Sequence, residues 1–164
     1  MTKYLLYILI IVFTSFCGYL LAKKYRKKKS FYAQFVVFNE RFISELSYFR
    51  RPIYEFISSY EYFGEFLFFL KEFLSNHEKN TVFLQELMDD TAFYFLKSDE
   101  KSMVVNYFSM LGRGDSHSQK VYFTSMNEIL KKAEVQAISN CKKYSELYLK
   151  MGFLIGLLII ILII

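Results

Sequence analysis

Residues 4–22 form an uncharged run that consists mostly of Leu, Ile, Tyr, Phe and Val. As an α-helix with a rise of ~1.5 Å per residue, this run would be roughly 28 Å long, close to the hydrocarbon thickness of a bilayer. A secretory signal peptide is the alternative, but there the positive charges precede the apolar run and a small-residue cleavage site follows it. Here only Lys3 precedes the run, and six basic residues follow it. We therefore expect a retained membrane anchor.

A second apolar segment, residues 151–164, has fourteen uncharged residues, fewer than the ~20 that usually span a bilayer. It can still span if the Lys150 ammonium reaches the interface and residues 147–149 extend the apolar length. A buried core helix is the alternative, but Leu and Ile cover this helix on all sides and leave no polar stripe. We expect a second membrane-spanning segment.

The basic residues beside the two runs predict the orientation, because Lys and Arg are retained on the cytoplasmic side of a membrane. Lys142, Lys143 and Lys150 precede the second run, and no charged residue follows it. We expect the middle of the chain in the cytoplasm and both chain ends outside. The expected division is residues 1–29 as anchor and basic juxtamembrane cluster, 30–150 as cytoplasmic helical domain, and 151–164 as a transmembrane segment continuous with the last helix.

The net charge of +5 comes from this juxtamembrane cluster, because without its six basic residues the chain carries −1. We see no basic and aromatic groove of the kind that tracks a nucleic-acid backbone. A juxtamembrane cluster binds anionic lipid headgroups. We therefore expect no nucleic acid as a partner and a membrane-surface role for Lys23, Lys24, Arg26, Lys27, Lys28 and Lys29.

The middle of the chain predicts helices joined by short connectors, because it holds a single proline and few glycines. Phe31, Phe35, Phe38 and Phe42 recur at helical spacing in an expected helix over 30–50. Pro52 fits the first turn of a second helix, which continues to about residue 60. Phe and Tyr residues would fill the core.

Three further helices are expected over 61–74, 81–96 and 99–111, and a last helix runs from Ser116 into the second span. The buried face of the 61–74 helix would begin at Phe63 and that of the 81–96 helix at Val82. The fold class is therefore all-α: an antiparallel bundle of about six helices, flanked by an N-terminal and a C-terminal transmembrane helix.

The start of the last helix carries several signals. Gly112 and Gly114 permit a left-handed backbone that ends the preceding helix. Ser116 and Gln119 form an S-x-x-Q capping box, and Asp115 adds a negative charge at the positive end of the helix dipole.

Small residues recur four apart in both expected spans. Gly152 and Gly156 form one such pattern, and Thr14, Gly18 and Ala22 form another at matching depth in the oppositely directed helix. This spacing lets two membrane helices approach closely, within one chain or between copies in a homo-oligomer. The alternative is that glycine is simply common in membrane helices.

We find no pattern that predicts catalysis, a cofactor or a metal site, and we expect the protein not to be an enzyme. The segment 115–117 reads Asp-Ser-His, but helix capping accounts for these residues, and nucleophilic catalysis also needs a base held against the hydroxyl. His77 and His117, the only histidines, have no second metal ligand at i+3 or i+4.

The sequence resembles the stage III sporulation protein AB family along essentially the whole chain. The resemblance rests on the anchor with its basic cluster, on the segment 45–48 (ELSY) shortly before Pro52, and most specifically on the segments 111–119 (LGRGDSHSQ) and 143–157 (KYSELYLKMGFLIGL). The second glycine of the 111–119 connector departs from the less glycine-rich turn expected there.

This resemblance implies a membrane protein of endospore-forming bacteria, made in the mother cell and sited in the membrane that faces the forespore. The helical domain would be similar to those of the inner-membrane platform protein of type II secretion and type IV pilus systems. The implied role is a platform or adaptor that couples a secretion-type ATPase of the same sporulation operon to other components of the channel between mother cell and forespore.

The partner-binding residues would then be Arg113, Asp115, Ser116 and Gln119. A structural lipid-binding or membrane-remodelling protein without an ATPase partner is the alternative.

Overall fold

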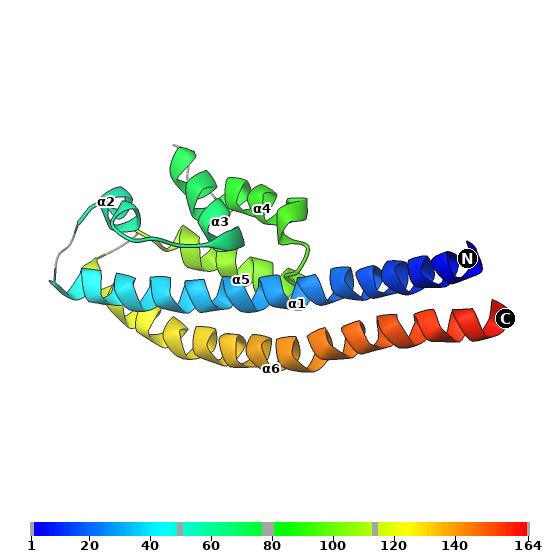
Figure 1. Ribbon diagram of the computed structural model, residues 1–164. Helices are drawn as coiled ribbons and strands as arrows, with labels where there is room; N and C mark the ends of the chain where they lie inside the picture. Colours follow the sequence, from blue (N-terminus) through cyan, green and yellow to red (C-terminus); the bar gives the residue numbers. More distant parts are fainter. Residues whose placement is uncertain (1, 49–50, 77–80, 113–114, 164) are drawn as a thin grey trace. The chain divides into compact units, whose positions relative to one another are not determined.

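The computed structural model of the protein describes residues 2–48, 51–76, 81–112 and 115–163 (Figure 1). These residues form six α-helices and one short 3-10 helix, with no β-strand among them. The predicted all-α fold, with a long apolar helix near each terminus, is confirmed. The helices are α1 (Thr2–Tyr48), α2 (Ile53–Ser58), α3 (Gly64–Ser75), α4 (Thr81–Asp89), η1 (Thr91–Phe93), α5 (Ser98–Ser109) and α6 (Ser116–Ile163).

The chain divides into two compact units. The first, here called the terminal unit, consists of Met1–Lys29 and Gln136–Ile164. The second, the core unit, is Ser30–Val135. Because α1 extends to Tyr48 and α6 starts at Ser116, each of these two helices contributes residues to both units.

In the terminal unit, α1 and α6 lie side by side and antiparallel, so that the start of α1 and the end of α6 lie at the same end of this unit (Figure 1). The contacts show the antiparallel direction, because the residue numbers in α6 fall as those in α1 rise: Ile11 lies near Gly156, Thr14 near Gly152, and Gly18 near Tyr148.

The core unit is built around aromatic side chains. Phe31, Phe35, Phe38 and Phe42 of α1 are all buried at the spacing that the sequence predicts. The ring of Phe35 lies 4.7 Å from that of Tyr107 in α5, edge to face, which is a favourable arrangement of aromatic quadrupoles. Buried aromatic rings from α2, α3, the segment after α4, α5 and α6 complete the core: Phe56, Phe66, Phe69, Phe73, Phe93, Phe95, Tyr107, Phe108 and Phe123.

The polar side chain of Asn39 lies within this aromatic core. Asn39 of α1 is fully buried, and its amide donates hydrogen bonds to the Phe123 carbonyl and to Asn127 Oδ1, both at 3.2 Å. The Tyr107 hydroxyl donates to Asn39 Oδ1 at 2.8 Å. Asn39 therefore joins α1, α5 and α6 through satisfied hydrogen bonds, which fix their relative register because a slip would leave buried polar groups unpaired.

The third predicted helix starts later than expected. α3 begins at Gly64, whose φ of +61° is a conformation that glycine adopts without a Cβ clash. The preceding residue, Phe63, is extended and its side chain is 60% exposed. The predicted burial of Phe63 is therefore wrong, because the chain has not yet entered the helix there.

The fourth predicted helix ends earlier than expected, at Asp89 instead of residue 96. Asp90 Oδ1 accepts a hydrogen bond of 2.7 Å from the backbone N–H of Ala92 and so caps the short helix η1. This turn redirects the chain and still buries Phe93 and Phe95. Val82, predicted to be buried, is instead 59% exposed.

Candidate functional site: the apolar helix pair and its basic rim

The terminal unit holds two helices that are long and apolar enough to cross a membrane. In their most apolar 18-residue windows only 11% of the α1 residues and 17% of the α6 residues are buried. The core helix of a water-soluble protein would be mostly buried, so the interpretation as buried core helices fits neither of these apolar segments. The large apolar side chains that the terminal unit exposes include Leu5, Leu9, Val12, Phe13, Leu154, Leu158, Ile161 and Leu162.

The structure places the predicted small residues at the contact between α1 and α6. A Cβ atom added to Gly18 would lie 2.5 Å from the Tyr148 carbonyl oxygen, and one added to Gly152 would lie 2.7 Å from the Thr14 carbonyl oxygen. Both obstructions are backbone atoms, which cannot rotate away. The two backbones therefore approach as closely as they do only because glycine occupies these positions.

Two further small residues belong to this contact. At Gly156 an added Cβ would lie 2.5 Å from the Thr14 hydroxyl, a side-chain atom, and 3.2 Å from Ile11 Cα. Ala22 is fully buried one turn beyond Gly18. Thr14 and Gly18 of α1 thus lie against Gly152 and Gly156 of α6 within one chain.

Between the glycine contact and the core unit in the sequence lies a group of aromatic and basic residues, here called the basic rim. The ring of Tyr25 stacks on Tyr144 and Tyr148 of α6, with centroids 5.0 and 5.9 Å apart. Arg26 donates a 3.2 Å hydrogen bond from Nε to Ser145 Oγ, and its guanidinium lies 5.2 Å from the centre of the Tyr19 ring. Tyrosine and basic side chains in this order are typical of a membrane interface, where rings meet headgroups.

The charge of the chain is divided unequally between the units. The terminal unit has ten basic residues and one acidic residue, a net charge of +9, whereas the core unit has eleven basic and fifteen acidic residues, a net charge of −4. The predicted membrane-surface residues Lys23, Lys24, Arg26, Lys27, Lys28 and Lys29 all belong to the terminal unit. The positive charge of the chain is therefore concentrated in the terminal unit.

The predicted partner-binding residues that the structure describes differ in exposure. Asp115 is exposed, Ser116 is half-buried, and Gln119 is buried at 7% exposure. Arg113 lies outside the described residues, as does His77. Gln119 is consequently unavailable to a partner unless the core unit opens.

The cap of α6 also differs from the predicted capping box. The carboxylate of Asp115 accepts hydrogen bonds from the backbone N–H groups of His117 and Ser118, at 3.2 and 3.3 Å. The hydrogen bonds from Ser118 hold the pKa of Asp115 below its ordinary value. Asp115 is therefore the N-cap, and Ser116 is the first residue of the helix.

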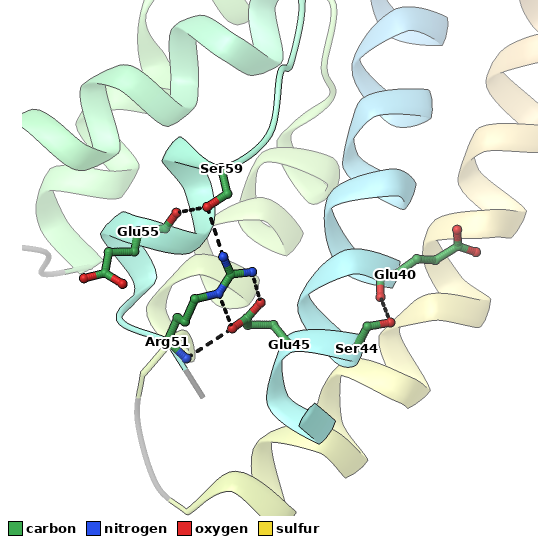
Figure 2. Close-up of polar contacts among 6 residues, drawn as sticks. All are labelled: Glu40, Ser44, Glu45, Arg51, Glu55 and Ser59. Atoms are coloured by element: carbon green, nitrogen blue, oxygen red, sulfur yellow. Dashed lines mark hydrogen bonds and ion pairs between the residues drawn. The ribbon is translucent and has the colours of Figure 1, made fainter. Parts of the chain in front are cut away.

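Besides the hydrogen bonds of Asn39, the core unit contains a polar group around Glu45 and Arg51 that was not predicted from the sequence. Figure 2 shows the Arg51 guanidinium in a two-pronged contact with the Glu45 carboxylate, with Nε to Oε1 at 2.9 Å and Nη2 to Oε2 at 2.7 Å. The backbone N–H of Arg51 also donates to Oε1, and Nη1 donates to Ser59 Oγ at 3.2 Å. We call this group the Glu45–Arg51 clasp.

The clasp connects the end of α1 to α2. The Glu45 side chain is only 3% exposed and that of Arg51 is 35% exposed, so the guanidinium covers a buried carboxylate. Hydrogen bonds from Arg51 hold the pKa of Glu45 below its ordinary value of 4.5. The geometry of the clasp is that of a structural contact between the end of α1 and the end of α2. No cluster of three or more His, Cys, Asp or Glu side chains able to hold a metal occurs in the described part of the chain.

Comparison with known proteins identifies the family. Curated proteins and solved structures give no match to this chain. The sequence model of stage III sporulation protein AB matches residues 3–164, which includes both long apolar helices and the whole core unit. The chain therefore belongs to the stage III sporulation protein AB family.

Proposed function

We propose that this sporulation protein is anchored in a membrane by both apolar segments and acts there as a platform or adaptor for a secretion-like channel. The observation that carries the anchoring is the terminal unit itself: two helices pair through glycine while their large apolar side chains face outward. Outward Leu, Ile and Phe are unfavourable in water and favourable in lipid.

The proposed location is the mother-cell membrane that faces the forespore, with the core unit in the cytoplasm and both chain ends outside that compartment. The basic rim supports this orientation, because Lys and Arg beside a span stay on the cytoplasmic side. The family membership supports the sporulation setting.

The proposed partner is the secretion-type ATPase of the same sporulation operon, together with other channel components. The resemblance to type II secretion and type IV pilus platform proteins supports this proposal. The helices add a physical reason: the chain passes from terminal unit to core unit through helical backbone in both α1 and α6. A force that a cytoplasmic partner exerts on the core unit would therefore reach the terminal unit along helical backbone and not through a loop.

Co-purification tests the adaptor role. The full chain, extracted from membranes in mild detergent, should retain the ATPase, and charge reversals on the exposed surface of the core unit should release it. Asp115→Lys is one such change, and Lys23→Glu in the terminal unit is the matched control that should leave the ATPase bound. If no variant and no wild-type preparation retains the ATPase, the adaptor role is wrong.

A lipid-binding structural role without an ATPase is the second candidate, and the net charge of +9 in the terminal unit favours it. The two roles differ in one result. A chain that deforms or clusters anionic vesicles by itself, and that retains no ATPase from sporulating cells, would fit the second role alone.

A further inference from the structure

The terminal unit has a groove along one flank of the helix pair. Its volume is about 220 Å³. α1 contributes Thr14, Cys17, Gly18 and Leu21, and α6 contributes Tyr148, Met151, Gly152 and Ile155. Gly18 and Gly152, where the two helix backbones meet, form part of its lining.

The groove has a distinct chemistry at each end. Its floor is apolar except for the Thr14 hydroxyl, which is already hydrogen-bonded to the carbonyls of Ile10 and Ile11. At the end nearest the basic rim, Tyr148 belongs to the stack with Tyr25 and Tyr144. An apolar channel that ends at tyrosines matches a molecule with a hydrocarbon tail and a polar head.

Helical geometry places cationic side chains beyond that end. At 3.6 residues per turn, Lys24 lies on the same flank of α1 as Cys17 and Leu21, seven and three residues further along, and Lys28 lies one turn beyond Lys24. The Lys24 side chain is exposed. Lys23, by contrast, projects from a different face of α1, and the only acidic residue of the terminal unit, Glu146, pairs with Lys150.

We propose that this groove is a binding site for one anionic glycerophospholipid, with an acyl chain along the groove and the phosphate near Lys24 and Lys28. The proposal rests on the membrane anchoring proposed above and adds a specific site to it. Charge complementarity selects this occupant over a second copy of the helix pair, because a second terminal unit of charge +9 would be repelled at the rim.

The test measures lipid bound to the full chain in detergent micelles. Phosphatidylglycerol and phosphatidylcholine with identical acyl chains are titrated, and native mass spectrometry counts the lipids retained. The wild-type protein should retain one phosphatidylglycerol in preference to phosphatidylcholine. Lys24→Gln should weaken that binding about fivefold, because a lysine near an anionic surface contributes about 1 kcal/mol. The matched variant Lys23→Gln removes the same charge from another face and should change it little.

A second pair of variants tests the groove independently of charge. Cys17→Phe should fill the groove and abolish preferential retention while the rim stays intact. Val12→Phe adds the same ring at an exposed position outside the groove lining and should not. Equal losses for Lys23→Gln and Lys24→Gln would show diffuse attraction in place of a site. Equal retention of the two lipids, or a dimer that Cys17→Phe dissociates, would also overturn the proposal.

This outcome is separable from that of the proposed function. Extraction of each variant with alkaline carbonate reports membrane integration, and ATPase co-purification reports the adaptor role. A chain that stays in the membrane and retains the ATPase but shows no lipid preference would refute only the lipid site. A chain that selects phosphatidylglycerol but retains no ATPase would refute only the adaptor role.

Discussion

The helices of the terminal unit and those of the core unit pack in opposite ways. Both units contain part of α1 and part of α6, and the core unit also contains α2, α3, α4 and α5. In the terminal unit the backbones touch at Gly18 and Gly152, and large side chains point outward. In the core unit large rings point inward, and sixteen of the nineteen phenylalanines lie within it.

Solvent explains the difference. In water, burial of a Phe side chain is stabilising, so rings collect between helices. In lipid the surroundings are already apolar, so burial of large side chains gains little and helices associate instead through close approach and dispersion contacts. The two packing modes thus indicate which part of the chain is adapted to which medium.

Removal of a central ring should have the largest effect on the core unit. Phe38 is fully buried and contacts the rings of Phe56 and Phe108 at 5.5 Å. Phe38→Ala should lower the free energy of unfolding by about 3–5 kcal/mol, because the cavity is only partly refilled. Urea unfolding of the full chain in detergent, followed by near-ultraviolet circular dichroism, measures it. Phe63→Ala, at an exposed ring, should change it little; equal losses would contradict the described core.

The clasp should make the core unit sensitive to acid. Because Arg51 lowers the pKa of Glu45 in the folded state, this contribution is complete above the ordinary pKa of 4.5 and is lost as the pH falls through the lowered value. Glu45→Gln should cost about 2–3 kcal/mol at pH 7 through weaker hydrogen bonds. Unfolding at pH 7 and pH 3 should show the wild type approaching the variant at acid pH. A difference that is independent of pH would exclude the clasp as its source.

Addition of a single methyl group should disrupt the terminal unit but would be harmless on most exposed helices. Gly152→Ala places a Cβ against the Thr14 carbonyl, and we expect a loss of about 1–3 kcal/mol from forced separation of the helices. Thermal unfolding in detergent micelles measures this loss. Gly156→Ala should cost less, since its shortest contact is with the Thr14 hydroxyl, a side-chain atom, and not with a backbone carbonyl. The reverse order would mean that the glycine contact is not where the structure places it.

Loss of the α6 cap should give the smallest effect. Asp115→Ala removes the acceptor for the N–H groups of His117 and Ser118 and should destabilise the start of α6 by about 1 kcal/mol. Ser116→Ala, one residue later, should have almost no effect. Hydrogen exchange of the first-turn amides of α6 distinguishes the two variants, and the opposite result would restore the capping box predicted from the sequence.

Sequence periodicity predicts features that depend on one helix at a time. The burial of Phe31, Phe35, Phe38 and Phe42 follows from spacing alone, and the apolar runs follow from composition. Where a helix starts was harder to predict, because Asp115 and Ser116 are both good caps one residue apart. Phe63 and Val82 look like helical core residues to any periodic pattern, but the first precedes its helix and the second lies at an exposed position of α4.

Contacts that depend on tertiary structure were not predictable in this way. The clasp joins Glu45 to Arg51 across the end of α1, where helical spacing no longer specifies neighbours. Asn39 was detectable in principle, because it lies four residues after Phe35 on the apolar stripe and a polar residue there needs buried partners. Its partners, Tyr107, Phe123 and Asn127, are set only by how α5 and α6 pack.

Protease protection in intact protoplasts tests the central claim, that lipid surrounds the terminal unit while the core unit lies in the cytoplasm. Protease added outside should leave residues 30–135 intact and cut them only after the protoplasts are lysed. Digestion of that region in sealed protoplasts, with the apolar ends spared, would contradict the proposed topology and the adaptor role together.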